Sequence, residues 1–479
     1  MKFLKLSLLA LVLFAATSCF DDMDDTISSS TTNVKDFVWK GMNFWYLYKS
    51  EIPDLADNRF SSNEEYSNYL NSFLTPEELF ESLIYQRETV DRFSAIVDDY
   101  IALEQSFDGT SYSNGLKYTL YEFPENSSNV IGIIKMVLND SEASAAGVQR
   151  GQIFNSVDGT VLNIDNYGQL LNQQSYTLGF VDYNDNGTPE NEDDFVESNG
   201  QTTSLTKVVY NENPVYISSI LEVNGENVGY LMYNRFNNNY DSHLNNAFAE
   251  FQASNVQHVI MDFRYNPGGS VNTASLLGSM VTGQFTGENF SKLIYNSDLQ
   301  SQNSTYEFKD SFNGIGINHL NLSKVYIITS ARTASASELV INSLNPYIDV
   351  VVVGDETVGK SQASITVYDS PNFTAQNRNP THTYALQPLV AQSINSLDEA
   401  VPSSGLVPEI EVIESALNLG VLGDVNEPLL AAALADIQGS SGRFAPSIEK
   451  PFLKPIDSDL DKNPFEDFMY LDDDHSPFK

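Results

Sequence analysis

Residues 325–338 read VYIITSARTASASE and join an apolar run to a cluster of small residues. The apolar run predicts a buried strand, and the residues that follow, 339–344, predict a helix. A small-residue turn between a strand and a helix can present a hydroxyl while the first amides of the helix remain unpaired. Ser335 in this turn is therefore a candidate nucleophile, and a serine nucleophile needs a general base.

A candidate base follows the next predicted strand. Residues 348–353 are apolar with one acid, and the run ends in GDETVGK at residues 354–360. Two parallel strands flanking one helix place Ser335 and Lys360 on neighbouring loops at the same edge of a sheet. The alternative for Lys360 is a surface lysine that the nearby Asp355 and Glu356 keep charged.

TASASE, followed by a lysine 25 positions after Ser335 (360 minus 335), resembles the C-terminal processing proteases, also called tail-specific proteases. Members of that family show S-A-S-A-S-E, in which the middle serine attacks and a downstream lysine is the general base. Thr333 replaces the first serine here. The resemblance covers most of the chain after residue 33. It implies that Ser335 and Lys360 are catalytic, in a crotonase/Clp-protease-like α/β domain.

Residues 262–269, DFRYNPGG, resemble the family's D-x-R-x-N-P-G-G. The resemblance implies an oxyanion hole formed by backbone N–H groups of Gly268 or Gly269 and of Ala336.

One departure from the family pattern concerns the lysine. Bacterial members commonly carry a glutamine four residues after it, thought to orient it, whereas this chain has Ser364 there and Gln362 nearby. Either side chain could orient Lys360 if the loop is re-registered; otherwise activity is expected to be weak. The alternative function is therefore a catalytically weak or inactive surface lipoprotein that binds peptides.

Changes of periodicity predict a multidomain α+β chain. Residues 91–94, DRFS, resemble a signature at the end of the family's N-terminal region, and residues 146–159, AGVQRGQIFNSVDG, resemble a PDZ domain. A PDZ domain is a small β-sandwich that binds an extended peptide on its sheet edge; the alternative is an ordinary β-sandwich loop. The predicted units are a helical N-terminal domain (33–108), a PDZ domain with an acidic insertion (109–212), a catalytic domain (213–440) and a loosely held acidic tail (441–479).

The first residues resemble a bacterial lipoprotein signal peptide (1–19). Basic residues precede a short apolar run that ends in Ala16-Thr17-Ser18-Cys19. Cys19 is the only cysteine, so no disulfide forms within one chain, and the lipobox pattern predicts that it is lipidated. The acidic tether (20–32) resembles the surface-export signal of Bacteroidetes lipoproteins, or is a solvated linker. We expect an exported protein lipid-anchored to the outer membrane, on its periplasmic face or at the cell surface.

Charge and motifs argue against other partners. A formal net charge of −39 disfavours nucleic acid and anionic headgroups. GDETVGKS at residues 354–361 fits the Walker A pattern, but residues 362–368 predict a strand where a P-loop needs a helix, so no nucleotide is expected. The five histidines show no metal-ligand spacing, and no metal or cofactor is required.

One acidic segment imitates a calcium loop. Asp182, Asn184 and Asn186 precede a glycine, and position twelve is Asp193. A structural calcium ion there competes with a plain acidic hairpin insertion. Taken together, the sequence predicts a serine endopeptidase with a Ser–Lys pair and PDZ-assisted recognition. It would cleave exported proteins that are unfolded or expose their C-termini.

Overall fold

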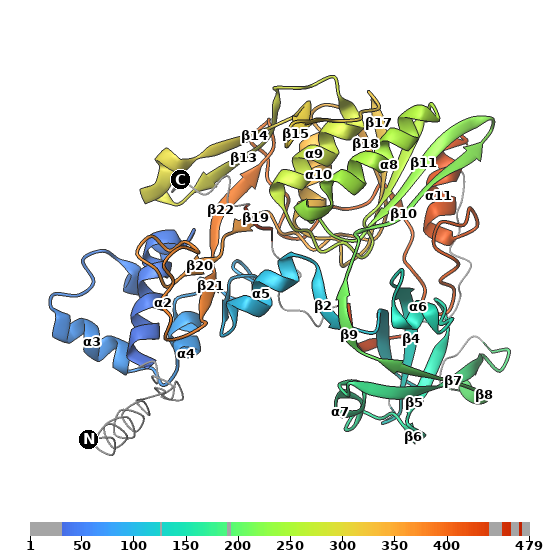
Figure 1. Ribbon diagram of the computed structural model, residues 1–479, viewed down its shortest axis with the longest axis horizontal. Coiled ribbons are helices and arrows are strands. Elements are labelled where there is room, and N and C mark those ends of the chain that lie inside the picture. The colour runs from blue at the N-terminus through green and yellow to red at the C-terminus, as the bar shows by residue number, and fades with distance from the viewer. Residues whose placement is uncertain (1–30, 125–126, 189–192, 440–452, 461–468, 472–479) are drawn as a thin grey trace, which may run out of the picture.

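The computed structural model describes residues 31–124, 127–188, 193–439, 453–460 and 469–471 (Figure 1). The predicted signal peptide, Cys19 and almost all of the tether lie outside the described residues. No helix within the described ranges combines the length and the apolar character needed to cross a membrane.

The centre of the molecule is a six-stranded sheet in the order β10-β11-β12-β17-β18-β23. Strands β11 to β23 are parallel, and β10 pairs antiparallel with β11 at one edge. The strands before Ser335 and Lys360 are parallel neighbours in this sheet, as expected from the sequence. The bounds are β10 (Val215–Val223), β11 (Glu226–Tyr233), β12 (His258–Asp262), β17 (Lys324–Thr329), β18 (Asp349–Gly354) and β23 (Ile410–Glu411).

Helices cover both faces of this sheet, which explains why its strands are apolar throughout. Three helices, α8 (Asp241–Ala253), α9 (Val271–Thr282) and α10 (Ala336–Leu344), share a core with one set of alternating strand residues, Leu231, Val259, Ile327 and Val352 among them (Figure 1). The other set, Tyr230, Ile260, Ile328 and Val353 among them, packs against α11 (Pro428–Ile437). The period of two along each strand thus divides the core into two layers.

The N-terminal region is helical, as predicted, with α2 (Thr31–Trp45), α3 (Asn63–Asn71), α4 (Pro76–Ser82) and α5 (Tyr100–Phe107). Thr75 caps α4 by accepting a hydrogen bond from the N–H of Glu78, and Pro76 occupies its first turn. This region is not packed as a separate unit. Its strand β1 (Ala95–Val97) pairs with β21 (Ala385–Gln387), and the buried apolar residues of α2, α3 and α4 belong to the core that contains α8, α9 and α10.

Two smaller sheets lie beside the central sheet, and one of them includes β1 of the N-terminal region. One has the order β14-β13-β22-β19 and the other β1-β21-β20. Their bounds are β13 (Asn289–Tyr295), β14 (Ser304–Glu307), β19 (Gln362–Ser364), β20 (Val367–Tyr368), β21 (Ala385–Gln387) and β22 (Leu389–Ile394), and a hairpin pairs β15 (Ser311–Phe312) with β16 (Ile315–Gly316). Four 3₁₀ turns complete this part: η1 (Lys49–Glu51), η2 (Pro53–Leu55), η3 (Asn238–Tyr240) and η4 (Ser297–Gln302).

A β-rich domain lies apart from the central sheet (Figure 1). The strand pair β2 (Thr110–Ser113) and β9 (Val208–Asn211) connects the two. The domain has its own apolar core around Leu120, Ile134, Phe154 and Leu178. Its elements are β3 (Leu116–Glu122), β4 (Val130–Val137), α6 (Glu142–Ala145), β5 (Ile153–Val157), β6 (Thr160–Val161), α7 (Tyr167–Leu171), β7 (Ser175–Asn184) and β8 (Phe195–Thr206).

The C-terminal tail differs from the expectation of a loosely held segment. Strand β24 (Pro455–Ser458) pairs antiparallel with β3 at the edge of the β-rich domain. Residues 469–471 form backbone hydrogen bonds with Gly269, Val271 and Ser364 in the catalytic region. The polar, proline-containing composition of the tail gave no signal that these short segments form backbone hydrogen bonds with the rest of the chain.

Candidate active site

Ser335 lies at the turn between β17 and α10, as predicted. It is the N-cap of α10 and is fully buried. Its backbone has φ +65° and ψ −117°, a conformation that is costly for a residue with a Cβ and that concentrates at functional sites. The turn is held from the neighbouring β12 loop, because Asn266 O accepts hydrogen bonds from Ala334 N (3.2 Å) and Ser337 Oγ (3.1 Å).

One buried carboxylate joins the serine turn to the lysine loop. Oε2 of Glu338 accepts hydrogen bonds from the N–H of Ser335 (2.8 Å) and the N–H of Lys360 (2.9 Å). Its Oε1 accepts from the N–H of Gly359 (2.7 Å) and from the hydroxyl of Thr357. The predicted nucleophile and the predicted base are therefore positioned by a shared partner.

Glu338 was not predicted as a site residue. The available signal was the spacing of serine and glutamate three residues apart at a helix start, which is typical of a capping box. Burial raises the pKa of Glu338 above its usual value, although the donors on Thr357, Lys360, Gly359 and Ser335 act in the opposite direction. These hydrogen bonds thus offset part of the cost of burying the carboxylate.

Lys360 is fully buried and lies where the loop after β18 ends. Its Nζ is 4.7 Å from the centre of the Phe93 ring. The neighbouring Arg92 donates hydrogen bonds to Val358 O (2.9 Å) and Gly359 O (3.0 Å). The DRFS segment of the N-terminal region therefore contacts the lysine and fastens its loop, a role that the sequence did not reveal.

The two glycines after β12 lie against the serine. Gly268 has φ +114°, and a Cβ there would be 2.6 Å from Cβ of Ser335 and 2.9 Å from N of Ala336. Only glycine fits this approach. The N–H of Gly268 donates to Oδ1 of Asn266 (2.9 Å), whereas Gly269 and Ala336 donate no backbone hydrogen bond to another described residue. Among the three predicted oxyanion donors, the latter two are therefore the pair whose N–H groups remain unpaired among the described residues.

The hydroxyl of Ser335 is buried and makes no hydrogen bond with any residue in the described ranges. Buried hydroxyls normally have partners, so the exception needs an explanation, although Ser291, Ser343 and Ser393 share this state. Catalytic hydrogen bonds are often loose before substrate binds. The geometry therefore brings Ser335 and Lys360 onto adjoining loops without joining their side chains.

The two predicted lysine-orienting residues form their hydrogen bonds elsewhere. Ser364 Oγ donates to Met469 O (3.2 Å), and Gln362 Nε2 donates to Gln392 Oε1 (3.4 Å). Oε1 of Gln362 is buried and has no partner among the described residues. In this structure the lysine loop is held instead by Glu338 and the DRFS segment.

A buried cluster of ion pairs includes residues at the start of the glycine turn. Arg264 is fully buried and pairs with Asp262 (2.7 Å) and with Glu427 (2.6 Å), the N-cap of α11. Glu414 pairs with Arg150 of the β-rich domain (2.6 Å) and lies 3.4 Å from Arg264. The glycine turn is thus linked by ion pairs to both α11 and the β-rich domain.

Two alternatives from the sequence can be compared with the geometry. The Walker-like loop runs into β19 and not into a helix, as expected. Asp182 of β7 accepts a hydrogen bond from Asn199 of β8, and in the acidic loop between these strands Asp193 accepts from Asn186 and Thr188. No group of three or more His, Cys, Asp or Glu residues suited to a metal gathers in the described ranges. The calcium loop stays a prediction, and no step below uses it.

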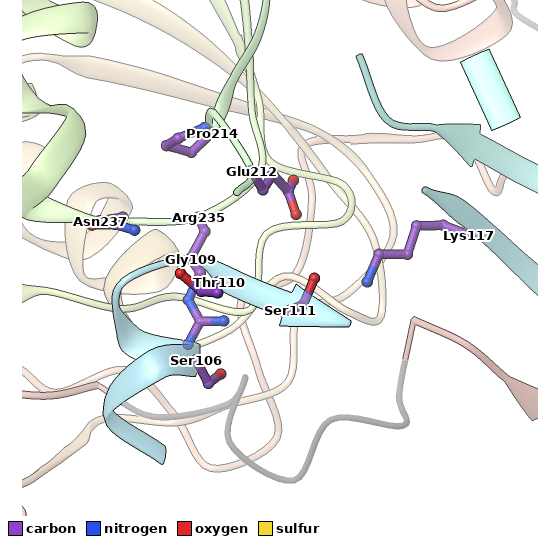
Figure 2. Close-up of a pocket in the computed structure, with 9 residues that line it drawn as sticks. All are labelled: Ser106, Gly109, Thr110, Ser111, Lys117, Glu212, Pro214, Arg235 and Asn237. Atoms are coloured by element: carbon purple, nitrogen blue, oxygen red, sulfur yellow. The ribbon is translucent and has the colours of Figure 1, made fainter. Parts of the chain in front are cut away.

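A small cavity lies at the junction between the N-terminal region, the β2–β9 pair and the catalytic region. Its volume is about 30 Å³. In Figure 2, Arg235 extends across β2 toward Ser106, while Glu212 and Lys117 lie on the other side. A cavity of this size holds on the order of one water molecule. It is therefore a packing junction and cannot accept a peptide.

Comparison with known proteins gives the family. The profile described as "Peptidase family S41" matches residues 227–377, and the "Peptidase S41 N-terminal domain" profile matches residues 33–95. The first match contains Ser335, Glu338 and Lys360, and the second contains Phe93. The chain belongs to peptidase family S41.

Several proteins resemble this S41 chain. A crystal structure of a Bacteroides fragilis protein assigned to the S41 proteases is 28% identical, with a TM-score of 0.69, and the match covers 84% of this chain and 97% of that one. The carboxyl-terminal-processing protease of a Picosynechococcus species is 23% identical over 49% of this chain and 50% of that one. The chloroplastic C-terminal processing peptidase of Tetradesmus obliquus is 24% identical over 46% and 45%. The match thus spans about half the length of these two relatives.

Proposed function

We propose that this S41 chain is a serine endopeptidase in which Ser335 attacks the scissile carbonyl carbon and Lys360 accepts the serine proton. The observation that carries the proposal is the bifurcated contact of Glu338 Oε2 with the amides of Ser335 and Lys360. It fixes the relative position of two loops whose side chains must meet, and such positioning can contribute several kcal/mol to catalysis, on the order of 7–11 in intramolecular reactions.

The reaction proceeds through an acyl-enzyme. The Ser335 oxygen forms a bond to the carbonyl carbon while Lys360 Nζ takes its proton, and the amides of Ala336 and Gly269 stabilise the oxyanion. The C–N bond then breaks, and the leaving amine takes the proton from Lys360. In the second half, Lys360 takes a proton from water while the water oxygen bonds to the ester carbon. The bond between that carbon and the Ser335 oxygen then breaks, and the serine oxygen takes the proton back from Lys360.

The remaining parts of the chain fit an exported processing protease. We propose that the β-rich domain is the PDZ domain, supported by its separate core and by strands whose edge can pair with a peptide. We propose further that Cys19 anchors the protein to the outer membrane through lipid. The substrates would be unfolded proteins or proteins with exposed C-termini, and no nucleic acid, nucleotide or required cofactor is part of the proposal.

A second function retains the fold without the chemistry. The hydroxyl of Ser335 is unpaired among the described residues, and neither Gln362 nor Ser364 forms its hydrogen bonds toward the lysine. These observations favour a weak or inactive enzyme that binds peptides through its β-rich domain.

Cleavage assays separate the two functions. The protein without residues 1–19 and its Ser335→Ala and Lys360→Ala variants would be incubated with an unfolded protein, and products followed by mass spectrometry. We expect cleavage that both variants lose while circular dichroism stays unchanged. Cleavage that survives Ser335→Ala places the active site elsewhere. Absence of cleavage combined with peptide binding supports the second function.

A further inference from the structure

Residues 469–471 form a short segment whose backbone lies between two walls of the candidate active site. Tyr470 N donates to Gly269 O (3.1 Å), and Val271 N donates to Tyr470 O (3.2 Å). On the other side, Ser364 N donates to Met469 O (2.7 Å), and Leu471 N donates to Ser364 O (3.2 Å). Both contacts are parallel bridges at Tyr470. The backbone of this segment is therefore paired on both sides.

The two walls are the segments that follow the predicted catalytic groups. One wall begins at Gly269, next to Gly268, whose missing Cβ leaves room for Ser335. The other wall is β19, which begins two residues after Lys360. A peptide that presents a carbonyl to a serine must be extended and held by its backbone, because side chains vary among substrates. Residues 469–471 occupy such a position.

The side chains of the segment fill apolar surroundings. Met469 and Leu471 belong to the large core around α8, α9 and α10. The Tyr470 ring stacks on Phe107 at 4.6 Å between ring centres, and its hydroxyl donates to Phe236 O (3.3 Å). Beyond them lies a cavity of about 410 Å³ with a mixed lining, in which Trp45, Ile365 and Phe373 stand beside Glu104, Asp108 and Arg378. The preference for large apolar residues therefore rests on the core packing of Met469 and Leu471 and on the stacked ring of Tyr470.

An earlier part of the same tail occupies the second edge where a peptide could pair. Strand β24 pairs with β3 of the β-rich domain, with Ser458 opposite Thr119 and Asp457 opposite Leu120. The Ser458 hydroxyl donates to Tyr118 O (3.1 Å). Two described segments of the C-terminal tail therefore pair with the two domains, one with each.

We propose that the segments flanked by Gly269–Val271 and β19 form the groove for an extended peptide with large apolar side chains, and that the chain's own Met469-Tyr470-Leu471 occupies it as an intramolecular competitor. The proposal rests on the proposed function for its identification of the groove as the substrate site. A tethered segment competes at an effective concentration in the millimolar range, so weak substrates are excluded until it leaves. Its departure also releases Ser364 Oγ, which now donates to Met469 O.

Peptide binding tests the proposal without requiring catalysis. The probe is a fluorescein-labelled peptide, EDFMYLDDD, which copies residues 466–474, with a scrambled peptide of equal composition as the control. Binding to the Ser335→Ala protein without residues 1–19 is followed by anisotropy. The same protein with Tyr470→Pro loses the N–H that pairs with Gly269 and the stacked ring. We expect it to bind the probe at least tenfold more tightly.

Two further variants control for other effects of the substitution. Tyr470→Phe keeps the backbone pairing and the ring, so its probe affinity should stay within about threefold of the parent. A chain ending at Leu460 removes the segment entirely while keeping β24, and should match Tyr470→Pro. In the chain with Ser335 intact, Tyr470→Pro should lower KM for an unfolded substrate and leave kcat unchanged, as removal of a competitor does.

The outcomes distinguish this proposal from the proposed function. Equal probe affinity with and without the segment overturns it, as does equal binding of the scrambled peptide. If Tyr470→Pro and the shortened chain both lose their cooperative unfolding transition, the segment is a structural strand, and the proposal is wrong. Tighter probe binding in a protein that never cleaves supports the groove and its occupant while refuting the peptidase function.

Discussion

Removing the carboxylate of Glu338 is the substitution that best tests how the site is assembled. In Glu338→Ala, the amides of Ser335, Gly359 and Lys360 lose their acceptor together, as does the hydroxyl of Thr357. Each buried donor without a partner costs about 1–3 kcal/mol. Water entering the space and removal of a poorly solvated charge offset part of this cost, since burial raises the pKa of Glu338. We expect the free energy of unfolding to fall by about 2–4 kcal/mol.

The effect on activity should be larger than the effect on stability. Glu338 fixes the distance between the serine turn and the lysine loop, and a misplacement of about 1 Å can cost on the order of 100-fold in rate. We therefore expect kcat for a fluorogenic protein substrate to fall at least about 100-fold, with a smaller change in KM. Urea unfolding and steady-state kinetics measure the two quantities on the same preparation.

A control on the same helix separates loss of fold from loss of the site. Leu344→Ala removes a buried side chain at the far end of α10 and should cost about 2–5 kcal/mol. Its specific activity should stay near that of the unmodified protein at temperatures where both are folded. The reasoning is refuted if Glu338→Ala keeps full activity, or if both variants lose activity in proportion to their stability.

Three further predictions concern residues around this site. Gly268→Ala should lower kcat/KM at least about 100-fold in the same kinetic assay, because its Cβ would displace Ser335; unchanged kinetics would contradict the packing. Glu427→Ala leaves Arg264 with one fewer buried carboxylate and should cost about 3–5 kcal/mol in urea unfolding, whereas a loss below 1 kcal/mol would refute this role. Burial raises the pKa of Glu414, but the positive charges of Arg150, Lys135 and Arg264 outweigh the effect of burial. They hold the pKa of Glu414 well below 4.5. The ionised Glu414 therefore stabilises the folded protein above pH 4.5, and this stabilisation is lost as the pH falls further. Glu414→Gln should have a lower free energy of unfolding than the unmodified protein at pH 7, and the difference should narrow in acid. A difference that stays constant with pH would refute the lowered pKa.

The catalytic geometry could be predicted as far as local patterns reach. The apolar run before Ser335, the helix after it and the next strand are each encoded by neighbouring residues, so their order placed Ser335 and Lys360 at one sheet edge. The glycine turn followed from its resemblance to the family motif. The predicted small-residue turn and the parallel pairing of the two flanking strands are confirmed.

The contacts that complete the site depend on residues far apart in the chain. Arg92 reaches the carbonyl of Gly359, 267 positions away, and Ser364 bonds Met469, 105 positions away. No periodicity or spacing encodes such pairs. The expected roles of Gln362 and Ser364 near the lysine were assigned from an offset in sequence, and a strand pairing with the tail takes the hydroxyl of Ser364 instead.

The contact between Arg92 and the lysine loop has a consequence for the order of folding. A chain that has formed only its central sheet holds Ser335 in its turn, yet its lysine loop has no fastening from the DRFS segment. Contacts between such distant parts of a chain close late, since loop closure must precede them. On the proposed function, the nucleophile is thus in place before the loop of its base has all of its contacts, so a partly folded molecule would cleave other unfolded chains poorly.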